Sequence, residues 1–467
     1  MFIGREEELN KLNQMYQSGK FEFAVIYGRR RIGKTTLIRE FCKDKKAIFF
    51  VGIESSLSNN LVNLSNSIFS VTMPAMEKKP IFEKLDDALD YLYSIAQKEH
   101  LVFVMDEYPY LANAERSVSS LLQFYIDQKF KDTNLMLILC GSSMSFMEKQ
   151  VLGYQSPLYG RRTAQFKIGP FDYHTSALFC KNYSDYDKAV VYGLTGGVPQ
   201  YLERIQPSWS LFENIVHTFL DPAGYFFEEP SNLLKQELRE PQMYNAIITA
   251  IANGSSKLNQ ISTAVGIDTA LCSSYISSLI SLGILKKEKP LGKENLKKSI
   301  YRVSDNMFRF WYRFIPANMN AIVNGNGELV FDKIVGPNLN DFMGGIFEQM
   351  CIQYLNRLNN AGKLPFPFFE IGCWWGTDSK QKKQVEIDIV AAFPRDKKVL
   401  FGECKFRNEP LDKQVLEELL EKSALLTDYD ERYYCLFSKS GFEKKFKKEH
   451  PDNVLLIDLK DMYAPDV

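Results

Sequence analysis

Short apolar runs alternate with helical patterns over the first 170 residues of the chain. Residues 21–27 form a mostly apolar run that predicts a buried strand, and residues 34–42 carry apolar positions at helical spacing. Buried strands separated by helices are typical of a parallel α/β sheet with both faces covered. An earlier helix is predicted at 6–16, and further strands at 47–51, 101–105, 135–140 and 164–168.

Four segments with different patterns follow residue 170. Residues 171–235 are mostly helical, and Gly196-Gly197-Val198-Pro199 marks a break that a helix start follows. Residues 236–305 predict three short helices and a hairpin, which is the pattern of a winged helix. Residues 306–335 predict an aromatic-rich helical connector, and 336–467 return to an α/β pattern. The helices predicted in this last part are 347–358 and 411–426, and the strands are 385–393, 399–406, 433–437 and 454–457.

Length and composition limit the number of domains, the partners and the location that the chain can have. A chain of 467 residues predicts two to four domains. Because 57 basic residues balance 57 acidic ones, any nucleic-acid or membrane site must be a local patch. The apolar runs are too short to cross a bilayer, and the N-terminus lacks the regions of a secretory signal. The eight cysteines contain no CxxC pair, so we expect reduced thiols, a cytoplasmic location and no zinc site. From the short apolar runs we expect no membrane partner.

A glycine-rich loop connects the strand at 21–27 to the helix at 34–42. It fits GxxxxGK[ST], in which backbone N–H groups and the helix N-terminus surround phosphate oxygens. We expect Lys34 to reach the β- and γ-phosphates of ATP and the Thr35 hydroxyl to bind Mg²⁺. A chance basic loop is the alternative, but the motif and its strand–helix context both match. The predicted nucleotide-binding residues are Gly28, Arg29, Arg30, Arg31, Ile32, Gly33, Lys34, Thr35 and Thr36.

Four further residues complete the predicted ATPase site. The apolar strand at 101–105 runs into Asp106 and Glu107, which we assign to Mg²⁺ and to the attacking water. The strand at 135–140 leads to Ser142, whose hydroxyl either senses the γ-phosphate or belongs to a simple turn. Arg161 either acts as an arginine finger on a neighbouring protomer, which implies a homo-oligomer, or is a solvated surface residue.

This order of strands and polar ends resembles the AAA+/STAND branch of P-loop NTPases. The segments Phe2-Ile3-Gly4-Arg5-Glu6, Leu158-Tyr159-Gly160-Arg161 and Gly196-Gly197-Val198-Pro199 resemble the archaeal-type ATPase family within that branch. The resemblance covers the first 235 residues. It implies that the first segment borders the adenine and that the Gly-Gly-x-Pro segment belongs to a helical lid. It also implies that a winged helix and a nuclease-like domain follow.

The predicted winged helix offers nucleic acid a weak contact. Its recognition helix, residues 269–279, has a mostly serine polar face and lacks the side chains that dominate direct base readout. Its wing is richer in basic than in acidic residues, which favours sequence-independent phosphate contact, although a solvated hairpin is the alternative. We therefore expect weak, salt-sensitive DNA binding. The wing charges are Lys286, Lys287, Lys289, Lys293, Lys297, Lys298 and Arg302, against Glu288 and Glu294.

Polar residues of the predicted C-terminal hairpin converge on one point. With the hairpin tip at residues 395–396, Asp388 and Glu403 face one another, and Glu403 shares a face with Lys405. Two carboxylates and a lysine can hold Mg²⁺, orient a water and stabilise a pentavalent phosphate. The three residues resemble the motif of the PD-(D/E)xK nuclease core, and Glu348 on the preceding helix resembles its additional metal acid.

The predicted fold class is α/β: a P-loop NTPase parallel sheet with a helical lid, a winged helix and a C-terminal restriction-endonuclease-like domain. The predicted domains are 1–170, 171–235, 236–305, 306–335 and 336–467. The predicted function is an ATPase coupled to DNA binding and to Mg²⁺-dependent nuclease activity. The alternative is an ATP-dependent regulatory switch whose C-terminal domain binds nucleic acid or protein without cleaving. A simple charged hairpin is a further alternative, because the motif is short and Glu-x-Lys is common by chance. Ile387 stands where the nuclease motif has its leading proline, a replacement that many members tolerate.

Overall fold

A computed structural model describes residues 2–292, 299–378 and 381–464. The chain divides into two compact units, and the division lies between Pro170 and Phe171. The predicted wing charges Lys293, Glu294, Lys297 and Lys298 lie outside the described residues. The predicted boundaries within the second unit stay predictions.

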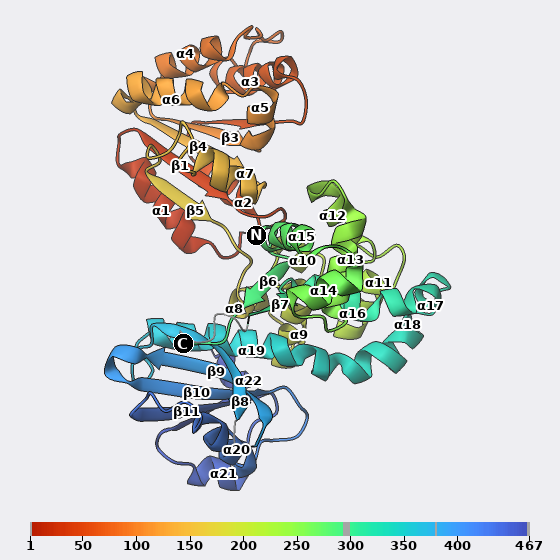
Figure 1. Cartoon of the computed structure of the whole chain (residues 1–467). Coiled ribbons are helices and arrows are strands. Elements are labelled where there is room, and N and C mark those ends of the chain that lie inside the picture. Colours follow the sequence, from red (N-terminus) through yellow and green to blue (C-terminus); the bar gives the residue numbers. More distant parts are fainter. Residues whose placement is uncertain (1, 293–298, 379–380, 465–467) are drawn as a thin grey trace. The chain divides into compact units, whose positions relative to one another are not determined.

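Within residues 2–170, five strands form one sheet (Figure 1). The strand order is β2-β3-β4-β1-β5, and all neighbouring strands are parallel. Every residue of β1, β3 and β4 is buried, as expected for central strands that helices cover on both faces. The predicted α/β fold class is confirmed. The strands are β1 (Glu22–Tyr27), β2 (Ala47–Val51), β3 (Leu101–Asp106), β4 (Leu135–Gly141) and β5 (Ala164–Lys167).

Alternate strand residues of this sheet pack on different helices. Phe23, Phe103 and Leu137 share one hydrophobic cluster with the helices α3 to α6, which Figure 1 shows together on one face of the sheet. Helices α1 and α2 lie on the other face (Figure 1). The helices are α1 (Glu6–Gln17), α2 (Lys34–Cys42), α3 (Leu57–Thr72), α4 (Leu85–Ala96), α5 (Tyr108–Ala114), α6 (Val118–Gln128) and α7 (Met144–Phe146).

The second unit begins with a helical part that contains the predicted Gly-Gly-x-Pro break. Gly197 has a φ of 71°, and a Cβ built there would lie 2.0 Å from the Phe171 carbonyl oxygen, so the turn requires glycine. Helix α10 starts directly afterwards, with Pro199 in its first turn. The helices are α8 (Tyr173–Ser176), α9 (Asp185–Thr195), α10 (Pro199–Leu202), α11 (Leu211–Phe219) and α12 (Glu229–Glu237).

The elements predicted for a winged helix follow. Three helices, α13 (Pro241–Ala252), α14 (Leu258–Val265) and α15 (Thr269–Ser281), precede the antiparallel strands β6 (Leu285–Glu288) and β7 (Ile300–Val303). The Asp268 side chain caps α15 by accepting from two backbone N–H groups. The connector contains α16 (Asn306–Phe314), α17 (Met319–Val323) and α18 (Gly327–Val330).

The chain ends in a second sheet, of the order β12-β11-β10-β9-β8. Strand β9 is antiparallel to both of its neighbours, whereas β10, β11 and β12 run parallel. Ile387, Phe401 and Leu419 belong to the core that joins this sheet to α20. The elements are α19 (Gly336–Asn360), β8 (Glu370–Asp378), β9 (Lys383–Phe393), β10 (Lys398–Lys405), α20 (Lys413–Ser423), β11 (Glu431–Ser438), α21 (Lys444–Glu449), β12 (Val454–Asp458) and α22 (Leu459–Met462).

Four of these elements differ from the sequence prediction. Helix α19 begins at Gly336, well before residue 347, and β8, α21 and α22 were not predicted. A β-bulge between Gly372 and Trp374 interrupts the register of β8 with β9, which obscures the alternation expected of a strand.

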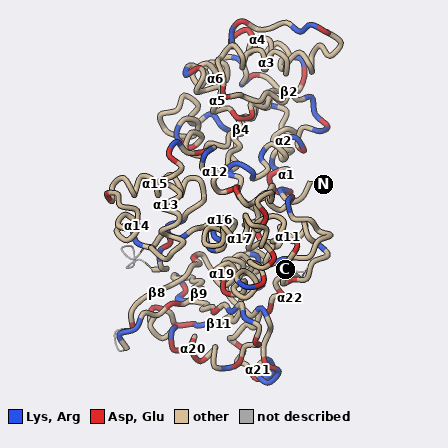
Figure 2. Tube along the Cα trace, turned by 90° about the vertical axis from the view of Figure 1, so that its right-hand side faces the viewer, with Lys and Arg blue, Asp and Glu red and all other residues tan. Residues whose placement is uncertain are grey.

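Charge and hydropathy are unremarkable along the described chain. Figure 2 shows basic and acidic residues interspersed, with a short basic group at α21. No single helix in the described ranges has the length and apolar character to cross a membrane, and only the bent pair α14 and α15 passes that test by length and composition.

Candidate functional site

The loop between β1 and α2 has the backbone of a phosphate-binding loop. A Cβ at Gly28 would lie 2.3 Å from the Ile168 carbonyl oxygen, so only glycine fits there. Arg31 and Gly33 have φ values of 72° and 85°, which turn the loop into the start of α2. The first turn of α2 then directs its N–H groups toward the space that the loop encloses. Of the other predicted loop residues, Ile32 is buried and Thr36 is exposed.

Lys34 is held inside this loop. Its ammonium donates to the carbonyl oxygens of Gly28 at 2.8 Å and Arg29 at 2.9 Å, and only 6% of the residue is exposed. A cation in this position can stabilise phosphate oxygens bound by the same loop. The neighbouring Arg30 guanidinium donates to the Tyr110 hydroxyl at 2.8 Å and so packs toward α5.

The parallel sheet brings the Asp106 carboxylate to Thr35. The Thr35 hydroxyl donates to Asp106 Oδ2 at 2.7 Å, and the other Asp106 oxygen accepts from the Glu107 N–H at 3.0 Å. Asp106 is almost fully buried, with 3% exposed. A hydroxyl beside a carboxylate supplies the hard oxygen atoms that Mg²⁺ prefers, so the residues present fit a magnesium ion.

Glu107 turns out of the sheet toward β4. Its φ of 49° and ψ of 42° are left-handed, which is uncommon for a residue with a side chain. Its carboxylate accepts from the Ser142 hydroxyl at 2.9 Å and from the Ser142 N–H at 3.3 Å. The strand order β3-β4-β1 therefore places Lys34, Thr35, Asp106, Glu107 and Ser142 at the carboxyl ends of neighbouring strands, as the sequence predicts.

Arg161 has a partner within its own unit. Its guanidinium donates to both Asp127 carboxylate oxygens, from Nε at 2.8 Å and from Nη2 at 2.6 Å. This bidentate pairing raises the pKa of Arg161. The residue is thus neither a freely solvated surface arginine nor already extended toward a second protomer.

The C-terminal hairpin has the predicted register. Phe393 pairs with Lys398 and Ile389 with Gly402, so Asp388 and Glu403 are the next opposed positions along β9 and β10. The Cys404 N–H donates to Asp388 Oδ2 at 2.8 Å. Burial and the Glu403 charge both raise the pKa of Asp388.

Two lysine side chains pair with the Glu403 carboxylate. Lys405 Nζ lies 2.7 Å from one carboxylate oxygen, and Lys422 Nζ lies 2.9 Å from each of the two. Only 4% of the Glu403 side chain is exposed. Lys422 could not be predicted from the sequence, because it belongs to α20 and no local pattern joins it to β10. Gln414 on the same helix donates to Glu418 at 3.0 Å.

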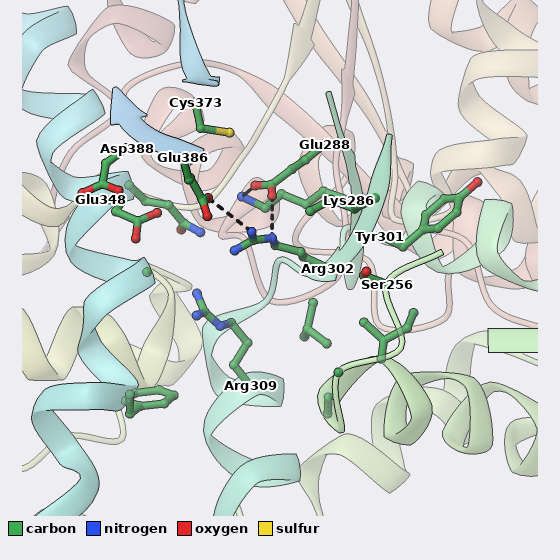
Figure 3. A pocket seen from close by; sticks show the side chains of 18 of the residues that line it. Ser256, Lys286, Glu288, Tyr301, Arg302, Arg309, Glu348, Cys373, Glu386 and Asp388 are labelled. Atoms are coloured by element: carbon green, nitrogen blue, oxygen red, sulfur yellow. Dashed lines mark ion pairs between the residues drawn. The ribbon is translucent and has the colours of Figure 1, made fainter. Parts of the chain in front are cut away.

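Glu348 and Asp388 line one cavity of about 510 Å³ (Figure 3). Glu348 comes from α19 and Asp388 from β9, and Figure 3 shows the two carboxylates close together at one end of the cavity. Burial raises the pKa of Glu348 to about 7, and the charges of Asp388 and Glu386 act in the same direction. In the described residues, no group of three or more His, Cys, Asp or Glu side chains is arranged to hold a metal ion, so the three predicted acids do not form a ready cage.

The predicted wing, β6 and β7, contributes basic residues to the same cavity. Arg302 lies between two carboxylates, with Nε 2.9 Å from Glu288 and Nη2 3.6 Å from Glu386 (Figure 3). Lys286 forms an ion pair with Glu288. The described wing charges are thus partly neutralised within the protein. Glu386 and Arg309, which also line the cavity, were missed by the sequence analysis because both lie outside the motifs.

A phosphate loop, its lysine and an Asp-Glu strand on a parallel sheet define the class of P-loop ATPases. Residues 2–205 match the family described as an ATPase domain predominantly from Archaea. An uncharacterised protein of Methanocaldococcus jannaschii is 33% identical over 469 residues, which covers 99% of this chain and 100% of that protein. The chain belongs to this archaeal ATPase family.

Three other comparisons are consistent with that assignment. Residues 311–419 match a family described as archaeal and bacterial proteins of unknown function. An uncharacterised ATP-binding protein of Methanocaldococcus jannaschii is 22% identical over 303 residues, covering 51% of this chain and 81% of that protein. The solved structure of a Walker-type ATPase of Pyrococcus abyssi has a TM-score of 0.50 and 19% identity, covering 67% of this chain and 96% of that one. This last likeness concerns the fold alone.

Proposed function

We propose that this ATPase binds DNA through its second unit and cleaves a phosphodiester bond there under the control of ATP hydrolysis. The observation that carries the proposal is the placement of Glu348 and Asp388 on one cavity. Asp388 also lies opposite Glu403, whose strand carries Lys405. Paired carboxylates beside an ammonium supply what metal-assisted phosphoryl transfer needs.

A magnesium ion fits the Glu348 and Asp388 pair. Mg²⁺ is commonly bound by one or two carboxylates, several waters and the substrate's own phosphates, so a third acid is not required. A cation would also relieve the repulsion of two like charges in a half-buried cavity. When bound, the ion polarises the phosphate and lowers the pKa of a water. Glu403 holds the Lys405 ammonium, which can neutralise charge that develops on the phosphate.

At the nucleotide site the residues have separate roles. Lys34 binds the β- and γ-phosphates, and Thr35 and Asp106 hold the magnesium ion of the nucleotide. Glu107 orients the attacking water, and Ser142 holds the Glu107 carboxylate in position. Arg161 would need to leave Asp127 before it reached the phosphate of a neighbouring protomer.

DNA contact through the winged-helix elements is weak and depends on phosphate charge. The recognition helix α15 presents serine rather than arginine or asparagine, which limits direct base readout. Glu288 partly neutralises both Lys286 and Arg302. We expect binding whose affinity falls steeply with salt and shows little sequence preference.

Cleavage assays on the full-length protein test the nuclease. Single- and double-stranded DNA and RNA are incubated with Mg²⁺, with and without ATP, and wild type is compared with Asp388→Ala. The control is Asp396→Ala, which removes an exposed carboxylate at the tip of the same hairpin. Cleavage by wild type and Asp396→Ala, but not by Asp388→Ala, supports the proposal. Equal cleavage by all three proteins would point to a contaminating nuclease and would refute the proposal.

One observation favours the alternative of a regulatory switch. Glu403, the second acid of the motif, is tied to Lys405 and Lys422 rather than facing a metal cluster. In that case the second unit binds DNA or a protein without cutting. ATP hydrolysis with DNA binding, but no cleavage of any substrate, would replace the nuclease by this switch.

A further inference from the structure

Two cavities adjoin between the wing and the C-terminal sheet. The inner one is the cavity of Glu348 and Asp388, with a volume of about 510 Å³. The outer one, about 940 Å³, extends along β7, the start of α14 and the strands β8 and β9. Both are lined by Tyr301, Arg302 and Glu386, so the two cavities meet at these residues.

The outer cavity combines aromatic faces with positive charge. Tyr301 and Trp375 are half-buried and line it from the wing and from the sheet. Lys257 and Lys287 are exposed at its margin, and the Lys287 ammonium lies 5.6 Å from the centre of the Tyr301 ring. Asn259, Thr377 and Gln384 add neutral hydrogen-bonding groups. Among the described residues that line it, the one acid is Glu386, which is paired with Arg302 at 3.6 Å.

The inner cavity adds a second arginine beside the acids. Arg309 points from α16 into the cavity, on the side opposite β9 (Figure 3). A Cβ at Gly345 would lie 3.1 Å from its guanidinium, so this glycine leaves the space that Arg309 occupies. A half-buried guanidinium near a metal-binding acid pair is suited to a phosphate group, which it can bind through two hydrogen bonds.

We propose that the two cavities form one groove for a single-stranded nucleic acid, with bases on Tyr301 and Trp375, backbone phosphates along Lys257 and Lys287, and one phosphate at Arg309. Aromatic faces in a positively charged groove are how proteins hold single strands without reading their sequence. Arg302 stands where the two cavities join, and a phosphate can replace Glu386 as its partner. The proposal rests on the proposed nuclease site for the role of the inner cavity, but binding in the outer cavity does not require cleavage.

The way the wing is attached favours a single strand over a duplex in the groove. The Leu291 N–H donates to the Cys373 carbonyl oxygen at 2.9 Å, which joins the wing to β8. The Arg302–Glu386 pair makes a second link, between β7 and β9. A single strand would replace only the Arg302–Glu386 pair, whereas a duplex would have to break the Leu291–Cys373 hydrogen bond as well.

Binding is measured on the full-length protein in EDTA, so that no cleavage contributes. The probes are short labelled oligothymidylate and a mixed-sequence duplex, followed by fluorescence anisotropy at two salt concentrations. We expect the single strand to bind more tightly than the duplex. Tyr301→Leu and Trp375→Leu should each weaken single-strand binding about tenfold, whereas Tyr301→Phe and Trp375→Phe should retain it. Lys287→Glu should weaken it and reduce its salt dependence.

Matched controls lie outside the groove. Phe369→Leu removes an aromatic ring that directly precedes β8, from a residue that is 73% exposed. Lys413→Glu reverses a charge on α20. Both should bind as wild type does. Tighter binding of duplex, or equal weakening by the groove and control variants, would overturn the groove. Cleavage assays with Mg²⁺ distinguish failure of the groove from failure of the nuclease. If Tyr301→Leu leaves cleavage unchanged, the groove alone is refuted. If binding depends on the groove residues but no substrate is cleaved, the nuclease alone is refuted.

Discussion

Replacing Lys422 by methionine tests how strongly the lysines around Glu403 stabilise the C-terminal sheet. The Lys422 ammonium lies 2.9 Å from both oxygens of a carboxylate whose side chain is 4% exposed. Methionine keeps most of the length of lysine but removes its charge. Glu403 would then keep only Lys405, at 2.7 Å.

The expected loss follows from these contacts. Removing one partner of a buried ion pair costs about 3–5 kcal/mol, because the remaining charge is buried without compensation. Lys405 still compensates part of the Glu403 charge, and the Lys422 side chain is itself 28% exposed. We therefore expect the free energy of unfolding of the second unit to fall by about 2–3 kcal/mol.

Tryptophan fluorescence during urea unfolding measures this loss. The four tryptophans, Trp209, Trp311, Trp374 and Trp375, all belong to the second unit, so the signal has no contribution from the nucleotide-binding sheet. The control is Lys413→Met on the same helix, whose pair with Glu417 joins side chains that are 74% and 55% exposed. That variant should lose less than about 0.5 kcal/mol. Equal losses for the two variants would refute the reasoning.

Three predictions concern the first unit. Glu107→Gln should retain ATP binding but slow hydrolysis at least about a hundredfold, as measured by nucleotide binding and phosphate release on the same protein. Hydrolysis near the wild-type rate would contradict the assignment of Glu107 to the attacking water. Gly28→Ala should weaken ATP binding, because its Cβ would lie 2.3 Å from the Ile168 carbonyl oxygen, and an unchanged dissociation constant would contradict this. If the bidentate pair is only structural, Arg161→Ala and Asp127→Ala should lower the melting temperature by similar amounts. A loss of ATPase activity with Arg161→Ala alone would indicate that Arg161 acts as an arginine finger on the nucleotide of a neighbouring protomer.

The nucleotide site could be located from the sequence because its signals are local. A strand, a glycine-rich loop and a helix are contiguous, and the conformation of Gly28 to Gly33 depends mainly on that segment. The strand ends at Asp106 and Ser142 were also predictable, since continuous apolar runs predict buried strands. The opposition of Asp388 and Glu403 followed from counting back from the hairpin tip, because antiparallel register depends on the turn.

The sequence pattern was less informative where an element is irregular. The bulge and two glycines of β8 break its alternation. Gly344 and Gly345 lower the helix propensity of α19, yet the helix continues through them because tertiary packing outweighs propensity.

By itself, then, the sequence determined the class of ATPase, its strands and phosphate loop, and the register of the C-terminal hairpin, all of which depend on short-range covalent geometry and hydrophobic periodicity. Only the tertiary structure decided that Lys422 neutralises Glu403, that Asp127 holds Arg161, and that Arg302 meets Glu386. These contacts join residues on different elements, and their energies depend on burial and on distances of a few ångströms. No local pattern of residues encodes such distances, because they are set by how whole helices and strands pack.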